Sequence, residues 1–163
     1  MKVFVKYGRK RAFLFAAIVA MGINFCTPPQ FRQLRTTYSP EARRNIVQTA
    51  QAQIGTPYRY GGSAPGGFDC SGLVMYVYRK NGIDVPRTAT DQYVEGTRVS
   101  KRNIRPGDLV FFRISGNGVS HVGIYAGRGK FIHAPKPGKR VGYASLTNPY
   151  WSRRFIGAAS YLN

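Results

Sequence analysis

The chain has few of the residues from which cross-links and reactive sites are usually built. Among 163 residues there are two cysteines, Cys26 and Cys70, two histidines, His121 and His133, and six acidic residues. Two cysteines cannot form a disulfide framework, and their positions match no familiar tetrahedral Cys/His zinc spacing. A bridge between them would need an oxidising compartment and would consume both thiols. We therefore expect a fold that is stabilised by its core.

The shortage of acidic residues leaves a large positive charge. The 25 Lys and Arg residues against 6 Asp and Glu give a net charge of +19, which is more than solubility requires. Such a charge attracts polyanions, among them nucleic acid, anionic envelope polymers and lipid head groups. The sequence lacks a helix-turn-helix pattern, zinc-finger spacing and an RNA-binding strand motif. We expect envelope polymers or a membrane surface as partners of a monomer, and no nucleic acid.

The N-terminal part is typical of an export leader followed by a tether. Residues 1–26 have a basic start and an apolar run that is too short for a comfortable membrane span. Cys26 stands where a bacterial lipoprotein carries its lipidated cysteine, but small residues also suit cleavage after Gly22, and both alternatives stay open. Residues 27–38 are polar and basic, as in a flexible tether. We expect an exported protein of the periplasm or cell envelope, with Cys26 as a candidate membrane anchor.

The remaining residues, 39–163, predict one α+β domain in which helices precede a meander of strands. Ser39 is the expected N-cap of the first helix, whose apolar stripe runs to Ile54 and which ends at Gly55. A Gly-rich irregular loop should follow at 56–69, then a helix from about residue 70 to Asn81-Gly82, a short helix at about 89–95, and strands at 109–112, 121–126 and 131–133, with two or three more within 140–162.

Cys70 is placed where a nucleophile could be activated. It lies at the junction of the Gly-rich loop and the second helix, where unpaired N–H groups and the helix dipole favour a thiolate. We therefore expect its pKa to lie below the ordinary value of about 8.5. Two alternatives stay open for Cys70 alone, an inert buried thiol and a ligand in a Cys-His-His metal site.

Both histidines fall on predicted strands that are joined by a short turn. A hairpin centred on Arg128 would place Tyr125 opposite Phe131. Because strand residues alternate between faces, His121 and His133 would then share one face as diagonal neighbours. A diagonal separation of about 7–8 Å is spanned by two side chains, so we expect the histidines to meet.

Six stretches resemble, in order and spacing, the NlpC family of papain-like cell-wall cysteine peptidases, and most of all its Spr-type murein endopeptidases. They are Tyr58–Gly62, Phe68–Leu73, Pro86-Arg87, Pro106–Phe112, His121–Tyr125 and Phe131–Ala134. The pair formed by Asp-Cys-Ser-Gly and the later His-Val-Gly-Ile-Tyr is the most specific part of this resemblance. The Asn-Pro-Tyr-Trp segment at 148–151 also resembles the Spr-type members.

The resemblance implies a papain-like NlpC fold with N-terminal helices packed on a central antiparallel β-sheet. The site that it implies consists of Cys70 as nucleophile, His121 as base, His133 as the residue that orients the base, Tyr58 beside the nucleophile for the oxyanion, and Asp69 and Ser71 in the same turn. The implied reaction is hydrolysis of an amide in peptidoglycan stem peptides or cross-links, with no cofactor or metal. A catalytically silent wall-binding protein and a thiol acyltransferase on the same fold stay open as alternatives.

Overall fold

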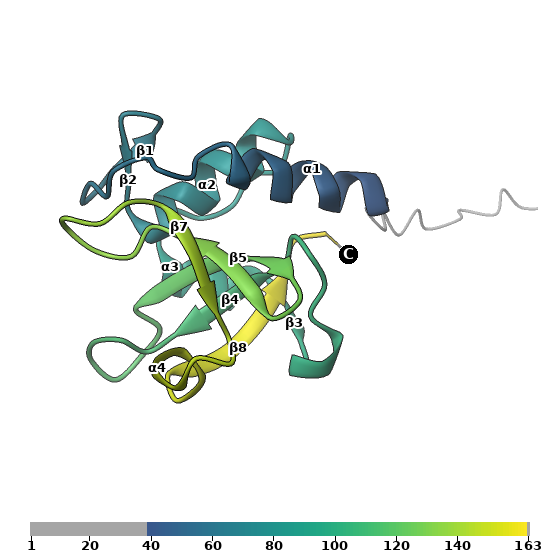
Figure 1. Ribbon diagram of the computed structural model, residues 1–163. Helices are drawn as coiled ribbons and strands as arrows, with labels where there is room; N and C mark the ends of the chain where they lie inside the picture. Colours follow the sequence, from purple (N-terminus) through teal and green to yellow (C-terminus); the bar gives the residue numbers. More distant parts are fainter. Residues whose placement is uncertain (1–38, 163) are drawn as a thin grey trace, which may run out of the picture. The chain divides into compact units, whose positions relative to one another are not determined.

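The computed structural model describes residues 39–162, in which helices cover one face of an antiparallel sheet (Figure 1). The predicted export signal, the tether at 27–38, Cys26 and the cleavage site after Gly22 lie outside the described residues. Within 39–162, no helix is long and apolar enough to cross a membrane.

The helices of this part of the chain are α1 (Pro40–Gln51), α2 (Cys70–Lys80), α3 (Ala89–Glu95) and α4 (Pro149–Ser152), with a 3-10 helix η1 (Lys101–Asn103). The strands are β1 (Ser63–Ala64), β2 (Gly67–Phe68), β3 (Thr97–Val99), β4 (Leu109–Phe112), β5 (His121–Gly127), β6 (Lys130–His133), β7 (Gly142–Ser145) and β8 (Phe155–Ser160). The main sheet has six antiparallel strands in the order β3-β8-β4-β5-β6-β7.

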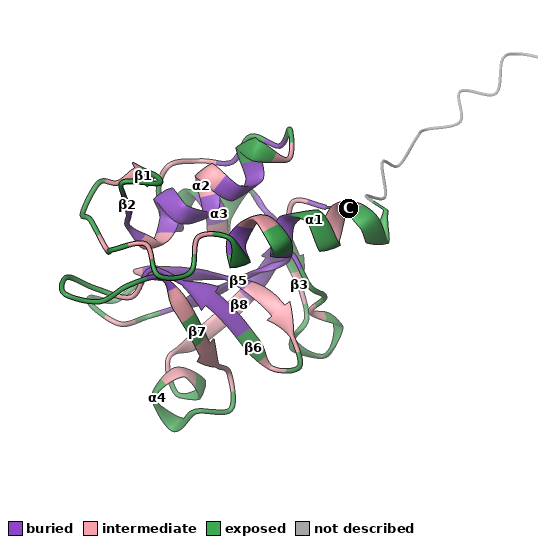
Figure 2. Cartoon of the chain, turned by 45° about the horizontal axis from the view of Figure 1, so that its top comes forward, coloured by how far each residue is buried: buried purple, intermediate pink, exposed green. Residues whose placement is uncertain are grey.

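Both faces of the central strands are packed. Alternate residues of the strands point toward α1 and α2 and form the larger core, which includes Ile46, Leu73, Leu109, Phe111, Val122, Ile124 and Ile132. The opposite face is a smaller aromatic cluster that includes Val110, Phe112, Phe131 and Trp151. All four residues of β4 are therefore buried, which explains its continuous apolar run. Figure 2 shows buried residues concentrated in the central strands and α2, with the outer side of α1 exposed.

The helix boundaries follow from local capping chemistry. The Ser39 hydroxyl accepts a hydrogen bond from the amide of Ala42 at the start of α1, as expected of an N-cap. Helix α2 ends at Lys80 with Asn81 as its C-cap, followed by Gly82 with φ of 75°, a left-handed conformation that glycine adopts at little cost. One expectation was wrong: α1 ends at Gln51, so Ile54 lies in the following turn and is 43% exposed.

Two other local expectations need correction. The segment 56–69 is not wholly irregular, because β1 and β2 pair within it. The β5–β6 hairpin has the predicted register centred on Arg128 where Ile124 pairs with Ile132 and Tyr125 with Phe131, and departs from it only at the tip, where Gly127 pairs with Lys130. The register shifts by one residue between Tyr125 and Gly127, and this bulge leaves a two-residue turn. The expected two or three late strands are β7 and β8, whereas β3 and α4 have no counterpart in the prediction.

Close backbone contact fixes the Gly-rich loop against the first turn of α2. A Cβ atom on Gly72 would lie 2.0 Å from the carbonyl oxygen of Gly62, and one on Gly62 would lie 2.3 Å from the carbonyl oxygen of Gly67. Real Cβ atoms do not approach backbone atoms so closely, so neither position has room for a side chain. These glycines therefore set the distance between the loop that carries Tyr58 and the helix that begins at Cys70.

Gly72→Ala should destabilise the domain, because the added methyl group must push the loop away from α2. We expect a loss of about 1–3 kcal/mol in the free energy of unfolding, as for other overpacked sites. Gly66→Ala is the matched control, since a Cβ there meets nothing within 4 Å. Urea denaturation of both variants measures the difference. Equal stability of the two variants would contradict the proposed loop contact.

Candidate active site

Cys70 is the first residue of α2 and lines a groove with a volume of about 440 Å³. The groove is lined by Tyr58, Tyr60, Gly61, Asp69, Cys70, Ser71, Arg87, Thr88, Ala89, Thr90, Val119 and Ser120. The structure thus brings Tyr58, Asp69, Cys70 and Ser71 together, as the resemblance implied. The thiol is partly exposed there, so a substrate could reach it.

The resting state of Cys70 differs from the expectation. Burial raises the pKa of its thiol, and the negative charge of Asp69 acts in the same direction. The backbone N–H groups of Val122, Ser71 and Cys70 favour the thiolate but do not outweigh burial. The prediction was wrong because the positive helix end does not offset the burial of the thiol, to which the charge of the capping Asp69 adds. The structure therefore describes a thiol that needs a base.

His121 and His133 form a buried pair that could supply this base. Nε2 of His121 lies 2.8 Å from Nδ1 of His133, and the residues are 2% and 5% exposed. Burial, and then the neighbouring charge of His133, lowers the pKa of His121 to about 3. Burial also lowers the pKa of His133 to about 4. Both imidazoles are consequently neutral at neutral pH, and they share one proton in their hydrogen bond.

The shared hydrogen bond determines which nitrogen of His121 could accept a proton. If Nε2–H of His121 donates to Nδ1 of His133, then Nδ1 of His121 carries a free lone pair. The opposite tautomer would place a proton on Nδ1 of His121 and leave it unable to act as a base. A residue with an acceptor atom at position 133 therefore selects the basic tautomer of His121.

Strand β5 brings the histidine pair to the Cys70 end of α2. The backbone N–H of Val122 acts to lower the pKa of the Cys70 thiol, and Val122 directly follows His121 in β5. Ser120, which directly precedes His121 in the sequence, lines the groove. The three residues predicted as nucleophile, base and orienting group thus lie on adjoining elements.

Trp151 in α4 closes the far side of the histidine pair. Its ring stacks on that of His121, with centroids 5.4 Å apart and planes at 28°. It meets His133 edge-on, with centroids 4.9 Å apart and planes at 90°. Phe112 and Phe131 complete this aromatic surrounding. These apolar rings exclude water, which explains why the pKa of each imidazole is lowered. The resemblance includes Trp151 but implies no role for it.

Asp69 and Ser71 belong to a polar cluster that also contains Arg87. Arg87 Nη1 lies 3.0 Å from Oδ1 of Asp69, and Nη2 lies 2.5 Å from Oδ2. The same Nη1 donates to the Ser71 hydroxyl at 2.9 Å, and that hydroxyl donates to Asp69 at 3.3 Å. Burial alone would raise the pKa of Asp69, but the hydrogen bonds from Arg87 and Gly72 lower it below its usual value.

Arg87 lies in one of the stretches that carry the family resemblance, but the resemblance implies no role for it. A signal was present, since a chain with six acidic residues should pair a buried carboxylate such as Asp69 with a cation. The hydrogen bonds that Arg87 donates to Asp69 raise the pKa of its guanidinium, so the guanidinium stays charged at the groove. Its side chain is 38% exposed and remains available to a ligand.

Gln92 in α3 ties two sides of the groove together from behind. It is fully buried, and its Nε2 donates to the carbonyl oxygens of Ser71 at 3.1 Å and Pro86 at 2.7 Å. These bonds fix the first turn of α2 to the segment that presents Arg87. Tyr58 lies at the opposite side, where burial, and then the charges of Cys70 and Asp69, raise the pKa of its phenol. The phenol therefore remains a hydrogen-bond donor.

Within residues 39–162, no group of three or more His, Cys, Asp or Glu side chains is arranged to hold a metal ion.

Comparison with known proteins places this geometry among its relatives. The model of a family described as the NlpC/P60 family matches residues 55–160. The murein DD-endopeptidase MepH of Escherichia coli (strain K12) is 48% identical over 123 residues, which cover 72% of this chain and 45% of that relative. The gamma-DL-glutamyl hydrolase of Bacillus subtilis (strain 168) is 45% identical over 121 residues, which cover 72% of this chain and 29% of the hydrolase. This chain therefore spans less than half the length of either curated relative.

Solved structures agree with the fold. An NlpC/P60 family protein from Bacillus cereus is 33% identical with a TM-score of 0.71, covering 74% of this chain and 40% of that one. The NlpC/p60 domain of the peptidoglycan hydrolase SagA is 39% identical with a TM-score of 0.65, covering 72% of this chain and 97% of that domain. The predicted fold of helices on an antiparallel sheet is confirmed, and so is the predicted resemblance.

Acid should destabilise the folded domain through its histidine pair. The folded pKa values of about 3 for His121 and about 4 for His133 lie below the ordinary 6.5, so the unfolded state binds more protons in acid. The stability due to the neutral pair is fully present above about pH 6.5 and is lost as the pH falls from there through about 4 to about 3. Urea titrations at several pH values should give a steeper loss for the natural chain than for a double variant, His121→Gln with His133→Asn. Parallel slopes would mean that the pair is not held neutral.

Proposed function

The chain belongs to the NlpC/P60 family, and from this premise we propose that it is a cysteine endopeptidase that hydrolyses amide bonds in peptidoglycan stem peptides or their cross-links. The observation that carries the proposal is the arrangement of Cys70 at the start of α2, in a groove next to strand β5, whose His121 is hydrogen-bonded to His133 of β6. A reachable thiol, a base whose tautomer is fixed and polar groups around them are the parts that thiol hydrolysis needs.

The proposed reaction begins from a neutral thiol and a neutral imidazole. Nδ1 of His121 accepts the Cys70 proton as the sulfur forms a bond to the substrate carbonyl carbon. The backbone N–H of Cys70 and the Tyr58 hydroxyl donate hydrogen bonds to the resulting oxyanion. The imidazolium of His121 gives its proton to the amine as the C–N bond breaks, which leaves a thioester on Cys70. Water then attacks the thioester carbonyl and gives a proton to Nδ1 of His121. The C–S bond breaks, the acid is released, and His121 returns the proton to the Cys70 sulfur, which restores the thiol.

The neutral resting pair fits this order of events. A buried imidazolium would be costly in the aromatic surrounding of His121 and His133, so charge should appear only while the oxyanion is forming. His133 then accepts a hydrogen bond from Nε2–H of His121 throughout, and it holds the ring without moving a proton. Trp151 keeps water away from the back of both rings.

The names of two relatives support an amide of the wall peptides as the bond that is cut. One is named a murein DD-endopeptidase and the other a gamma-DL-glutamyl hydrolase. The charge of +19 supports the same polymer and other anionic envelope components as partners of a monomer. A location in the periplasm or cell envelope follows from this proposal, with residues 1–26 as the export signal and Cys26 as a candidate lipid anchor.

Cys70→Ala should abolish muropeptide release while leaving stability nearly unchanged, because only a sulfur atom is removed from a partly exposed site. Purified peptidoglycan would be digested, and the soluble products weighed by mass spectrometry. A gain of one water per cut bond indicates hydrolysis, whereas transfer to an added amine indicates an acyltransferase. Cys26→Ala is the matched control and should keep its activity on soluble muropeptides. Substantial activity of the Cys70 variant would refute the mechanism, and an inactive natural chain that still binds sacculi would favour the silent wall-binding protein.

The contribution of His133 should depend on its acceptor atom. His133→Ala leaves Nε2–H of His121 without its partner, so we expect turnover to fall by roughly 10²-fold or more. His133→Asn offers a carbonyl oxygen to the same N–H and should recover much of the rate. Iodoacetamide should still alkylate Cys70 in both variants. A low turnover would then be due to the orientation of His121 and not to loss of the thiol. Two equally inactive variants would mean that His133 does more than orient His121.

A further inference from the structure

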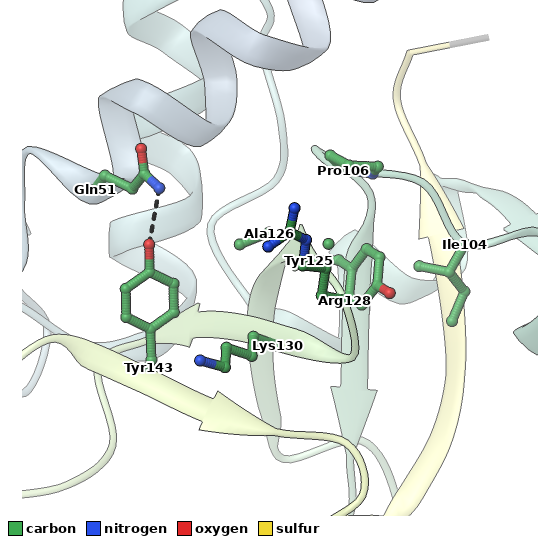
Figure 3. Close-up of a pocket in the computed structure, with 9 residues that line it drawn as sticks. Gln51, Ile104, Pro106, Tyr125, Ala126, Arg128, Lys130 and Tyr143 are labelled. Atoms are coloured by element: carbon green, nitrogen blue, oxygen red, sulfur yellow. Dashed lines mark hydrogen bonds between the residues drawn. The ribbon is translucent and has the colours of Figure 1, made fainter.

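A second hollow lies at the end of β5 that is remote from His121 (Figure 3). Its volume is about 690 Å³, and its lining comprises Gln51, Ile104, Pro106, Tyr125, Ala126, Gly127, Arg128, Lys130 and Tyr143. It lies between Gln51, the last residue of α1, and strands β5, β6 and β7. None of these residues lines the Cys70 groove. Six residue steps along β5 separate Gly127 from His121, which is about 20 Å in a strand.

The hollow carries positive charge that nothing in its lining neutralises. Arg128 and Lys130 are exposed, and no lining residue is acidic. Neither cation takes part in the ion pairs found within residues 39–162, which join Arg43 to Asp108, Arg79 to Asp84 and Arg87 to Asp69. In Figure 3 both side chains extend beside the open space between α1 and the strands. An anionic group could therefore be bound by two cations at once.

The turn between β5 and β6 requires a positive φ at residue 128, but it does not require an arginine there. Arg128 has φ of 51° and Gly129 has φ of 71°, and Arg128 is the one non-glycine residue with positive φ among those described. Positive φ at both positions is the two-residue turn for which Asn-Gly is preferred. The amide of Gly129 donates to the Tyr125 hydroxyl at 3.0 Å, which holds the turn in place. An arginine is thus kept where asparagine would be less strained, and this points to a use for its side chain.

Tyr143 offers a fixed aromatic wall beside these cations. Gln51 Nε2 donates to its hydroxyl at 2.8 Å (Figure 3), and its side chain is nevertheless 48% exposed. Tyr143 pairs with Ile132 and Lys130 pairs with Ser145, so Tyr143 and Lys130 are diagonal neighbours on one face. An anchored ring next to a cation suits a ligand that combines an apolar sugar or peptide surface with a negative charge.

We propose that this hollow is a second binding site for peptidoglycan, which takes a carboxylate of a glycan-bound stem peptide between Arg128 and Lys130 and its apolar surface against Tyr143. The identity of the polymer rests on the proposed function. Stem peptides repeat along a glycan strand. One stem peptide can therefore occupy this hollow while another stem peptide of the same glycan strand enters the Cys70 groove. The second attachment raises the effective concentration of substrate at Cys70 without any new contact there.

The test compares binding of full-length chains that carry Cys70→Ala, which prevents digestion, to purified sacculi. Adding Arg128→Asn with Lys130→Gln should weaken binding by about five- to tenfold, as expected for two exposed charge contacts. Arg44→Gln with Lys80→Gln is the matched control, since it removes the same charge from exposed positions outside the hollow and should have a smaller effect. Arg128→Asn alone should weaken binding while raising the melting temperature by roughly 2–5 °C, because it relieves the turn.

Equal binding losses in the two double variants would overturn the site and leave only the overall charge. A lower melting temperature for Arg128→Asn would overturn the argument from strain. Sacculi with amidated carboxylates should bind the Arg128/Lys130 variant and its parent alike, and a persisting difference would overturn the choice of carboxylate. If the Arg128/Lys130 variant loses duplex DNA binding but binds sacculi as its parent does, the hollow is not a peptidoglycan site.

Activity distinguishes this inference from the proposed function. With Cys70 intact, the Arg128/Lys130 variant should digest a single soluble muropeptide at the natural rate, since such a substrate is too short to span both sites, and should digest sacculi more slowly. A natural chain that digests neither substrate contradicts the proposed function, whereas equal digestion of sacculi by variant and natural chain contradicts the second site.

Discussion

The carboxylate of Asp69 is the constraint on which the geometry around Cys70 depends. Its Oδ1 accepts the amide of Gly72 at 2.7 Å and so caps α2, while its Oδ2 accepts the amide of Gly61 at 3.0 Å from the preceding loop. Both oxygens also bind Arg87. One side chain thus fixes a helix, a loop and a distant segment relative to each other. The hydrogen bonds from Arg87, Gly72 and Gly61 explain why the pKa of Asp69 is lowered, so its charge stays in place over the working pH range of most proteins.

The position of Asp69 also affects the pKa of the Cys70 thiol. A helix N-terminus usually favours a thiolate, but here the capping carboxylate is adjacent to Cys70, and burial raises the pKa of the thiol. The histidines meet the opposite requirement, since their aromatic surrounding lowers the pKa values of both rings. Thiol and imidazole are thereby both neutral in the folded chain at neutral pH. Reactivity toward adventitious electrophiles is reduced by the same arrangement, because the thiolate is the reactive form.

The sequence was sufficient for what depends on local pattern and insufficient for what depends on burial. The start of α2 at Cys70, helix α3 at Ala89–Glu95 and the pairing of Tyr125 with Phe131 were all predicted, because capping residues and strand alternation act over a few positions. The sign of the Cys70 pKa shift was wrong, since desolvation depends on elements packed from far along the chain. Trp151 contacts His121 across 30 positions, and no local pattern indicates that contact. The bulge before the β5–β6 turn likewise depends on tertiary packing.

Charge is distributed unevenly along the chain, and this affects how the sheet meets a polymer. All six acidic residues lie between Glu41 and Asp108, so the chain beyond Asp108 carries Lys and Arg without any acidic residue. Asp69, Asp84 and Asp108 are moreover engaged in ion pairs. The strands from β5 to β8 therefore cannot be neutralised by their own sequence. Strand β5 has the candidate base His121 at one end and leads at the other end into the basic turn at Arg128, so one rigid element links the two proposed sites. Because a strand does not flex over that length, the spacing between the two is fixed by the fold and does not depend on loop conformation.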